Sequence, residues 1–329
     1  DAIDPQAPIF QQRIQYAPGQ GAMRAAALQR QAGVQAVTAE TVHTVATSRT
    51  PGFLGLTGTG GLYEQGLKGE NVIIGIIDSG ITPEHPAFSD KVDANGKPVQ
   101  SHLPGTVVYQ PISASRTWNG VCQTGPGFPA SACNNKLIGL WDFVDGGADG
   151  KTGAASVDAK DKDGHGTHTA STTSGNPVKI TIPGGTPVYT PTISGVAPRA
   201  NIIAYKACNA TGCPPSMTIA SINQAVLDGV NVISYSIGGS PVDPYSAFGT
   251  PAIDDDAEAF LAARAAGIVS SVAAGNDGPS PGTLSNPSNS PWVMSVAATT
   301  HDRALIRPLV LTGGNTPRPG GGTLFGSGS

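Results

Sequence analysis

"NVIIGIIDSG", residues 71–80, is a short apolar run that ends in an aspartate, a serine and a glycine. Comparable runs recur along the chain: "KLIGLWDF" at 136–143, "NIIAYKA" at 201–207, "NVISYSI" at 231–237, "GIVSSVAA" at 267–274 and "WVMSVAA" at 292–298. They are rich in β-branched residues and show no clean alternation of apolar and polar positions. This pattern is typical of strands that are buried on both faces of a sheet.

Two longer segments between these runs, residues 216–229 and 254–267, repeat their apolar residues at roughly helical spacing. The alternation of strands and helices predicts an α/β fold, a doubly wound parallel sheet with helices on both faces. Ligands and catalytic groups in such folds collect at the carboxyl ends of the strands. The residues that follow each run are therefore the first candidates for a functional site.

Three of the predicted strands are followed by residues of a kind that often carries function. Asp78 ends the first run, "SIGG" (236–239) follows "NVISY", and Asn276 follows "GIVSSVAAG". Each also has a structural explanation, because Asp-Ser-Gly and Gly-Asn sequences form turns or caps and a Gly-Gly pair relieves crowding. Their shared location at one edge of the predicted sheet favours a site.

A histidine lies between two glycines in "DKDGHGTHTASTTSG", residues 161–175. The glycines permit a tight turn around His165 and leave its imidazole uncrowded, and the small residues after it suit a helix packed closely on a sheet. An imidazole can take a proton from a hydroxyl nucleophile and return it to a leaving group. Asp78 is the acid best placed to orient it. The alternative is a histidine that only caps or packs the helix.

A metal site is the competing interpretation of the same stretch. His165 and His168 are three residues apart and follow Asp161 and Asp163, so the group could bind zinc. However, paired zinc-binding histidines on a helix are usually four residues apart, and no HExxH motif is present. No acidic loop has the ligand spacing of a calcium site, and the acidic run at 254–256 is expected to begin a helix. We therefore expect no cofactor; calcium stays open as an alternative, although no ligand pattern supports it.

The composition narrows the class of protein. The chain has 329 residues with 13% charged residues, a net charge of −4, 44 glycines and 28 prolines. Its ordinary apolar content excludes a disordered chain, and the lack of a Lys/Arg cluster argues against nucleic-acid binding. No apolar run is long enough to span a membrane. Abundant glycine and proline are expected of a secreted α/β protein with many loops.

The four cysteines fall in two close pairs. Cys122 and Cys133 flank a Gly/Pro-rich loop, and Cys208 and Cys213 flank "NATG". The even number and the short loops favour two local disulfides, which predicts an oxidising, extracellular location. A zinc site built from these cysteines is the alternative, although neither pair has zinc-type spacing to a partner pair.

Taken together, the segments "IIDSGI" around Asp78, "DGHGTHTA" around His165 and "AAGNDGP" around Asn276 resemble the subtilisin-like serine proteases (subtilases). They occur in that family's order along the chain. The similarity extends from about residue 48 to residue 303 and includes "GVAPRANIIAYKAC" and "SNPSNSPWVMSVAATTHDR". It is greatest to the long form of plant and some bacterial subtilases, in which a protease-associated domain interrupts the catalytic domain.

The resemblance implies a role for each of these residues. Asp78 would orient the imidazole of His165, which would act as general base and then general acid, and Asn276 would donate its side-chain amide to the oxyanion. One edge of the primary specificity pocket would be formed by Ser236, Ile237, Gly238 and Gly239, and this edge would also pair with the substrate backbone. The other edge would be formed by Ala273, Ala274 and Gly275. These small residues imply an open pocket, suited to large apolar or aromatic side chains.

The resemblance also divides the chain into three parts. Residues 1–46 resemble the second half of the family's inhibitory propeptide, a small α+β domain; the alternative is an ordinary N-terminal extension. Residues 47–312 resemble the N-terminal part of the peptidase domain, and 313–329 form a Gly/Pro-rich tail or linker. The expected function is a secreted serine endopeptidase made as a zymogen. Its partners would be protein or peptide substrates and its own propeptide as inhibitor, with neither nucleic acid nor membrane involved.

One family motif is absent from the chain. The family's nucleophile lies in a "GTSMA"-type motif at the start of a helix, and no such stretch follows Asn276. Ser327 and Ser329, in "FGSGS", have no helix after them and are not suitable nucleophiles. Three explanations stay open: the serine lies in a missing C-terminal part of the same protein, it lies on a second chain after processing, or the protein is an inactive peptide-binding relative.

Overall fold

The computed structural model describes residues 50–99, 104–109, 112–113, 116–125, 128–144, 158–181, 190–248, 255–298, 306–309 and 324–327. The chain separates into two compact units, which are described separately below. One comprises Val45–Thr300, and the other comprises Asp1–Thr44 together with His301–Ser329. The propeptide-like segment predicted at residues 1–46 lies outside the described residues.

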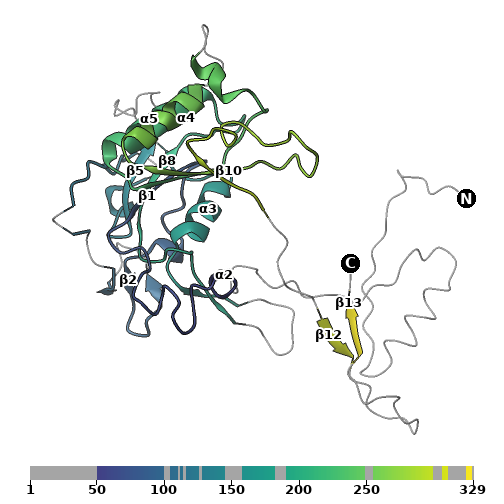
Figure 1. Ribbon diagram of the computed structural model, residues 1–329. Helices are drawn as coiled ribbons and strands as arrows, with labels where there is room; N and C mark the ends of the chain where they lie inside the picture. Colours follow the sequence, from purple (N-terminus) through teal and green to yellow (C-terminus); the bar gives the residue numbers. More distant parts are fainter. Residues whose placement is uncertain are drawn as a thin grey trace, which may run out of the picture. The chain divides into compact units, whose positions relative to one another are not determined.

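The centre of the larger unit is a six-stranded, fully parallel sheet with the strand order β11-β10-β9-β1-β8-β5. Each strand falls inside one of the six predicted runs (Figure 1). The bounds are Ile73–Asp78 for β1, Leu137–Asp142 for β5, Asn201–Lys206 for β8, Val232–Tyr235 for β9, Val269–Ala273 for β10 and Met294–Val296 for β11. The predicted α/β parallel sheet is confirmed.

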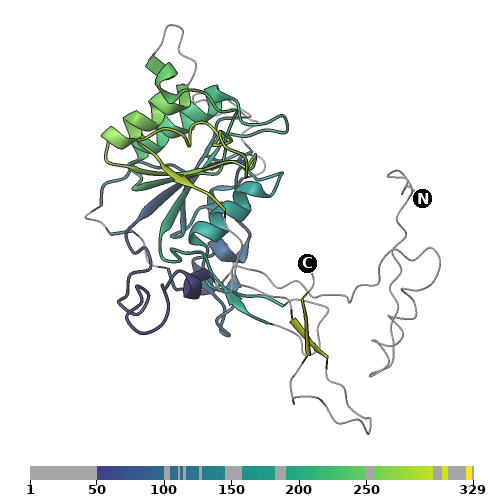
Figure 2. The same ribbon diagram turned by 45° about the vertical axis from the view of Figure 1, so that its right-hand side comes forward.

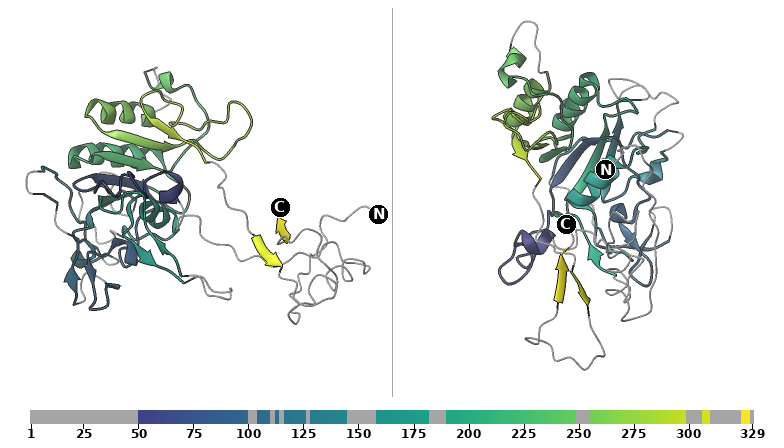
Figure 3. Two further views of the ribbon diagram at one scale, coloured as in Figure 1. Left: turned by 60° about the horizontal axis from the view of Figure 1, so that its bottom comes forward. Right: turned by 90° about the vertical axis from the view of Figure 1, so that its right-hand side faces the viewer.

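Helices cover both faces of this sheet, as predicted. On one face lie α4 (Pro215–Asp228) and α5 (Asp255–Ala265), which pack against each other, and on the other lies α3 (His165–Ser174). Figures 2 and 3 show these layers from other directions. The predicted helices at 216–229 and 254–267 are confirmed, and the acidic run begins α5 as expected.

The central strand β1 divides its apolar side chains between two cores. Ile73 and Ile77 join a cluster with side chains of α4 and α5, whereas Ile74 and Ile76 join a cluster that includes Ala170 of α3. All six residues of β1 are buried, which explains why its sequence shows no alternation. The edge strand β11 differs, because its three residues are exposed. The prediction of a strand buried on both faces is wrong for this one.

Smaller elements surround the sheet. A helical turn, α2 (Thr50–Phe53), has its proline in the first turn, where a missing N–H costs nothing. The short antiparallel strands are β2 (Lys91–Val92), β3 (Pro98–Val99), β4 (Thr106–Val107), β6 (Val178–Lys179) and β7 (Thr192–Ile193). The 3₁₀ turns are η2 (Pro86–Phe88), η3 (Ala130–Ala132) and η4 (Pro244–Phe248).

The described part of the second unit is a two-stranded antiparallel ladder. It consists of β12 (Ile306–Leu309) and β13 (Leu324–Ser327), paired from Ile306 with Ser327 to Leu309 with Leu324. The strand β13 lies within the segment 313–329 that was predicted as a tail or linker. The boundaries of the three predicted parts of the chain stay predictions.

Candidate active site

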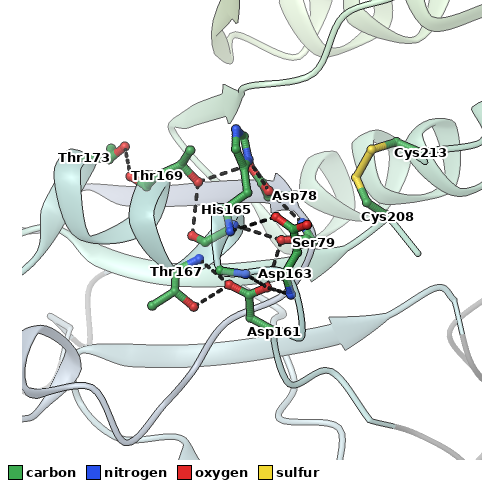
Figure 4. A network of polar contacts seen from close by, with 12 residues as sticks. Asp78, Ser79, Asp161, Asp163, His165, Thr167, Thr169, Thr173, Cys208 and Cys213 are labelled. Atoms are coloured by element: carbon green, nitrogen blue, oxygen red, sulfur yellow. Dashed lines mark hydrogen bonds and ion pairs between the residues drawn. A yellow bond between two sulfur atoms is a disulfide. The ribbon is translucent and has the colours of Figure 1, made fainter. Parts of the chain in front are cut away.

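The aspartate at the end of β1 and the histidine at the start of α3 are in direct contact. His165 Nδ1 lies 2.8 Å from Asp78 Oδ1, although the two residues are 87 positions apart in the sequence. Figure 4 shows the imidazole standing over the carboxylate. The predicted pairing of these two side chains is therefore present in the fold.

The carboxylate of Asp78 is fixed by two further hydrogen bonds. Its Oδ1 accepts the backbone N–H of Ser79 at 2.7 Å, and its Oδ2 accepts the hydroxyl of Thr169 at 3.1 Å. Asp78 is almost fully buried, so its oxygens have little access to water. Thr169 lies one helical turn after His165 and was not identified from the sequence, because it is one of several similar small residues in "THTASTTSG".

The imidazole is partly open to solvent while its partner is not. The side chain of His165 is 49% exposed and that of Asp78 only 3%. An ionised carboxylate can only accept hydrogen bonds, so this contact places the proton of the neutral imidazole on Nδ1 and leaves Nε2 as the basic atom. The hydrogen bond to Asp78 raises the pKa of His165; burial opposes this, and the charges of Asp78, Asp163 and Asp161 add to it.

The glycines around His165 are required by backbone geometry. Gly164 is in the left-handed region with a φ of 101° and precedes the first helical residue. A Cβ on Gly166 would lie 2.2 Å from the carbonyl oxygen of Gly80, so no other residue fits without moving the backbone. The close approach of α3 to the end of β1 therefore depends on these glycines.

Asn276 lies three residues after β10, at the same edge of the sheet as Asp78, because β10, β9 and β1 are parallel neighbours. It is exposed, and among the described residues its side-chain amide makes no hydrogen bond. The structure thus leaves this amide available, and it makes no hydrogen bond with Asp78 or His165.

The two predicted substrate-binding edges approach each other around a serine that the sequence did not indicate. A Cβ added to Gly238 would lie 2.5 Å from Ser285 Oγ, and one added to Gly275 would lie 2.8 Å from it. The backbone N–H of Ser285 donates to Ala274 O, and its hydroxyl to Ala273 O. Ser285 is buried between segments 236–239 and 273–275, and its long-range contacts leave no trace in the local sequence.

Comparison with known proteins assigns the chain to a family. The model of the subtilase family matches residues 69–316, which is most of the chain. The chain belongs to the subtilase family. Among its relatives in Arabidopsis thaliana, the subtilisin-like protease SBT1.4 is 40% identical over 290 residues, covering 85% of this chain and 34% of the relative. SBT2.1 is 39% identical over 293 residues, covering 86% of this chain and 32% of that protein.

The chain therefore spans about a third of the length of these plant subtilases. The family match includes all three sequence segments singled out above, and it confirms the resemblance drawn from them. The roles assigned to Asp78, His165 and Asn276, and to the two substrate-binding edges, stay predictions.

The cysteines of this subtilase form two disulfides. Cys122 bonds to Cys133 with an S–S distance of 2.01 Å, and Cys208 bonds to Cys213 at 2.05 Å. The alternative of a zinc site built from these cysteines is wrong, because each sulfur is already bonded to another sulfur. The second disulfide begins two residues after β8, near Asp78 (Figure 4).

Asp161, one of the acids in the alternative zinc site at the histidines, has other partners. Instead of facing His165 and His168, the carboxylate of Asp161 binds hydroxyl and backbone N–H groups. In the part of the chain that the structure describes, no group of three or more His, Cys, Asp or Glu residues is arranged to hold a metal ion. Among the same residues, no helix is both long and apolar enough to cross a membrane.

Proposed function

We propose that the protein to which this chain belongs is a secreted serine endopeptidase, in which Asp78 and His165 are two members of an Asp-His-Ser triad. The observation that carries the proposal is the 2.8 Å contact between a buried carboxylate and a half-exposed imidazole. This arrangement supplies a base of fixed tautomer whose free nitrogen can meet a nucleophile from outside.

The proposed reaction has two stages. His165 Nε2 takes the proton of the serine hydroxyl as the serine attacks the peptide carbonyl, and it then returns the proton to the leaving amine. A water molecule next attacks the acyl-enzyme with the same assistance. Asp78 keeps Nδ1 protonated and stabilises the imidazolium in both stages, and the free amide of Asn276 is the proposed donor to the oxyanion.

The nucleophile in this proposal comes from outside the 329 residues. The chain contains no "GTSMA"-type segment and spans about a third of its relatives, which supports a serine elsewhere in the same protein. The alternative is a protein that binds peptides through the same edges without cutting them. Retention of a fixed base, with Asn276 exposed at the same edge of the sheet, favours the enzyme.

The proposed substrates are proteins or peptides bound in an extended conformation. Segment 236–239 would add the substrate backbone as a strand, and segment 273–275, with Ser285 beside it, would receive a side chain. The two disulfides support secretion, because such bonds persist in oxidising compartments. We propose further that residues 1–46 act as an inhibitory propeptide and that the reaction needs no cofactor.

The proposal is tested by measuring hydrolysis of a denatured protein substrate by the complete protein, with fragments identified by mass spectrometry. We expect cleavage by the wild type and none by His165→Ala, with a chelator having no effect. Tight peptide binding without cleavage would favour the non-catalytic alternative. Inhibition by a chelator together with stoichiometric zinc would instead favour a metal-dependent hydrolase.

A further inference from the structure

The carboxylate of Asp161 is buried and accepts five hydrogen bonds. Its Oδ1 accepts from Ser79 Oγ at 3.0 Å, from Asp163 N at 3.0 Å and from Gly164 N at 2.8 Å. Its Oδ2 accepts the backbone N–H of Thr167 at 2.8 Å and the hydroxyl of the same residue at 2.6 Å. A carboxylate with this many donors has one stable orientation (Figure 4).

The N–H groups in the first turn of α3 find their hydrogen-bond acceptors in an unusual way. The first turn of a helix leaves N–H groups without partners, and a side chain at the N-cap normally accepts one. The N-cap of α3 is Gly164, which has no side chain. Instead, Ser79 Oγ accepts the N–H of Gly166 at 2.9 Å, and Asp161 accepts that of Thr167.

The partners of Asp161 are the immediate neighbours of the proposed catalytic pair. Ser79, which follows Asp78 in the sequence, contacts Asp161. It also contacts Gly166, which is the residue after His165. Thr167 Oγ1 also accepts the backbone N–H of Thr82, on the loop after β1. One carboxylate therefore connects the end of β1 to the first turn of α3.

The charge of Asp161 strengthens this connection. Burial alone would raise the pKa of Asp161, but the hydrogen bonds from Thr167, Gly164 and Ser79 outweigh burial and lower it. The carboxylate is thus ionised at neutral pH. A negative charge next to the first turn of a helix is also favoured by the helix dipole.

We propose that Asp161 is a positioning residue for the catalytic pair, holding His165 Nδ1 against Asp78 through Ser79 and Thr167. The effect on catalysis rests on the proposed function, whereas the effect on the geometry of the pair does not. Because His165 begins α3 and Asp78 ends β1, displacement of the helix start moves the imidazole away from its partner. Such misplacement of a catalytic group by about 1 Å can cost roughly a hundredfold in rate.

The test compares two Thr→Val variants on the same helix, neither of which changes a charge. Thr167→Val removes the hydroxyl that binds Asp161, whereas Thr173→Val removes a hydroxyl that, among the described residues, binds Thr169 O alone. The pKa of His165 is measured by NMR titration in the 329-residue chain, and kcat and KM are measured in the complete protein. We expect Thr167→Val to lower the pKa of His165 toward 6.5 and kcat by about tenfold, with KM little changed.

Thr173→Val is expected to leave both quantities at their wild-type values. The proposal is overturned if the pKa of His165 is unchanged in Thr167→Val, or if both variants lower it equally. If Thr167→Val fails to fold, Ser79→Ala is used in its place. This substitution also changes no charge, removes the hydroxyl of Ser79 that binds Asp161 and must lower the pKa of His165 in the same way. A complete protein that cuts no peptide defeats the proposed function, and the pKa comparison still decides the role of Asp161.

Discussion

Two buried aspartates of this molecule each accept three hydrogen bonds from the described residues, yet only one of the two is proposed to act in catalysis. Asp78 binds Ser79 N, Thr169 Oγ1 and His165 Nδ1. Asp228, fully buried at the end of α4, binds Trp141 Nε1 at 2.7 Å, Tyr205 OH at 2.8 Å and Gln224 Nε2 at 2.8 Å.

The difference lies in the partners. Asp78 holds a titratable side chain that is half exposed, so a change in the protonation of the imidazole alters its interaction with a buried charge. Asp228 holds two buried aromatic side chains and a glutamine, none of which exchanges a proton near neutral pH. A buried carboxylate alone therefore indicates only a fixed polar network, and the accessible imidazole makes the first network suitable for chemistry.

The largest expected difference between the two sites is catalytic. Asp78→Asn should lower kcat of the complete protein by about 10⁴-fold, the size of loss known for this change in a trypsin-type triad, because an amide N–H facing Nδ1 holds the imidazole in the wrong tautomer. Thermal unfolding of the variant should change little by comparison. Steady-state kinetics beside calorimetry measure both, and a variant with near-wild-type kcat would contradict the role of Asp78.

The second difference concerns stability. Asp228→Ala leaves the indole N–H of Trp141 and the hydroxyl of Tyr205 unpaired in the core, so we expect a loss of about 3 kcal/mol in the free energy of unfolding. The matched control is Glu258→Ala, an exposed acid on α5, which should change stability by less than about 0.5 kcal/mol. Urea unfolding compares them, and equal losses would refute the structural role of Asp228.

The third difference is in the response to pH. The pKa of Asp228 is raised, with burial as the main cause, so the native state binds a proton that the unfolded chain has already lost. Asp228 therefore favours folding below its native pKa, and stability falls as pH rises through that value. In Asp228→Asn this fall should disappear. Unfolding curves collected between pH 4 and neutrality provide the measurement, and an unaltered pH profile would count against it.

The smallest expected effect comes from removing a single hydrogen-bond donor to Asp228. Tyr205→Phe keeps the ring and removes one of the three hydrogen bonds to Asp228, which should cost about 1 kcal/mol of stability. Catalysis in the complete protein should be unaffected, because this network is separate from His165. A clear loss of kcat at a temperature where the variant is folded would show that the two networks are coupled.

Much of the fold and the central pair could be predicted from the sequence, for physical reasons. Strands buried on both faces require uninterrupted apolar runs, and catalytic groups of such sheets gather at the strand ends, so β1 and Asp78 were readily found. His165 was marked by glycines that its close packing requires. In these cases the constraint acts on neighbouring residues and is therefore visible in a short stretch.

The remainder depends on contacts between distant segments. Ser79, Thr169 and Ser285 are common residue types whose positions in the site follow from the packing of α3 and of segment 285–286. Lys136 begins a predicted strand, yet it is fully buried, with its ammonium bound to Tyr109 OH and to backbone carbonyls. No local pattern distinguishes such a lysine from an exposed one.

The central claim is that the Asp78–His165 pair activates a serine, and labelling by a fluorophosphonate probe tests it most directly. The labelling rate of the complete protein is measured against pH for the wild type and His165→Ala. Because the hydrogen bond to Asp78 raises the pKa of His165, the rate should increase through a midpoint above 6.5, and His165→Ala should not be labelled. A wild type that never labels, or a variant that labels as fast as the wild type, would contradict the account.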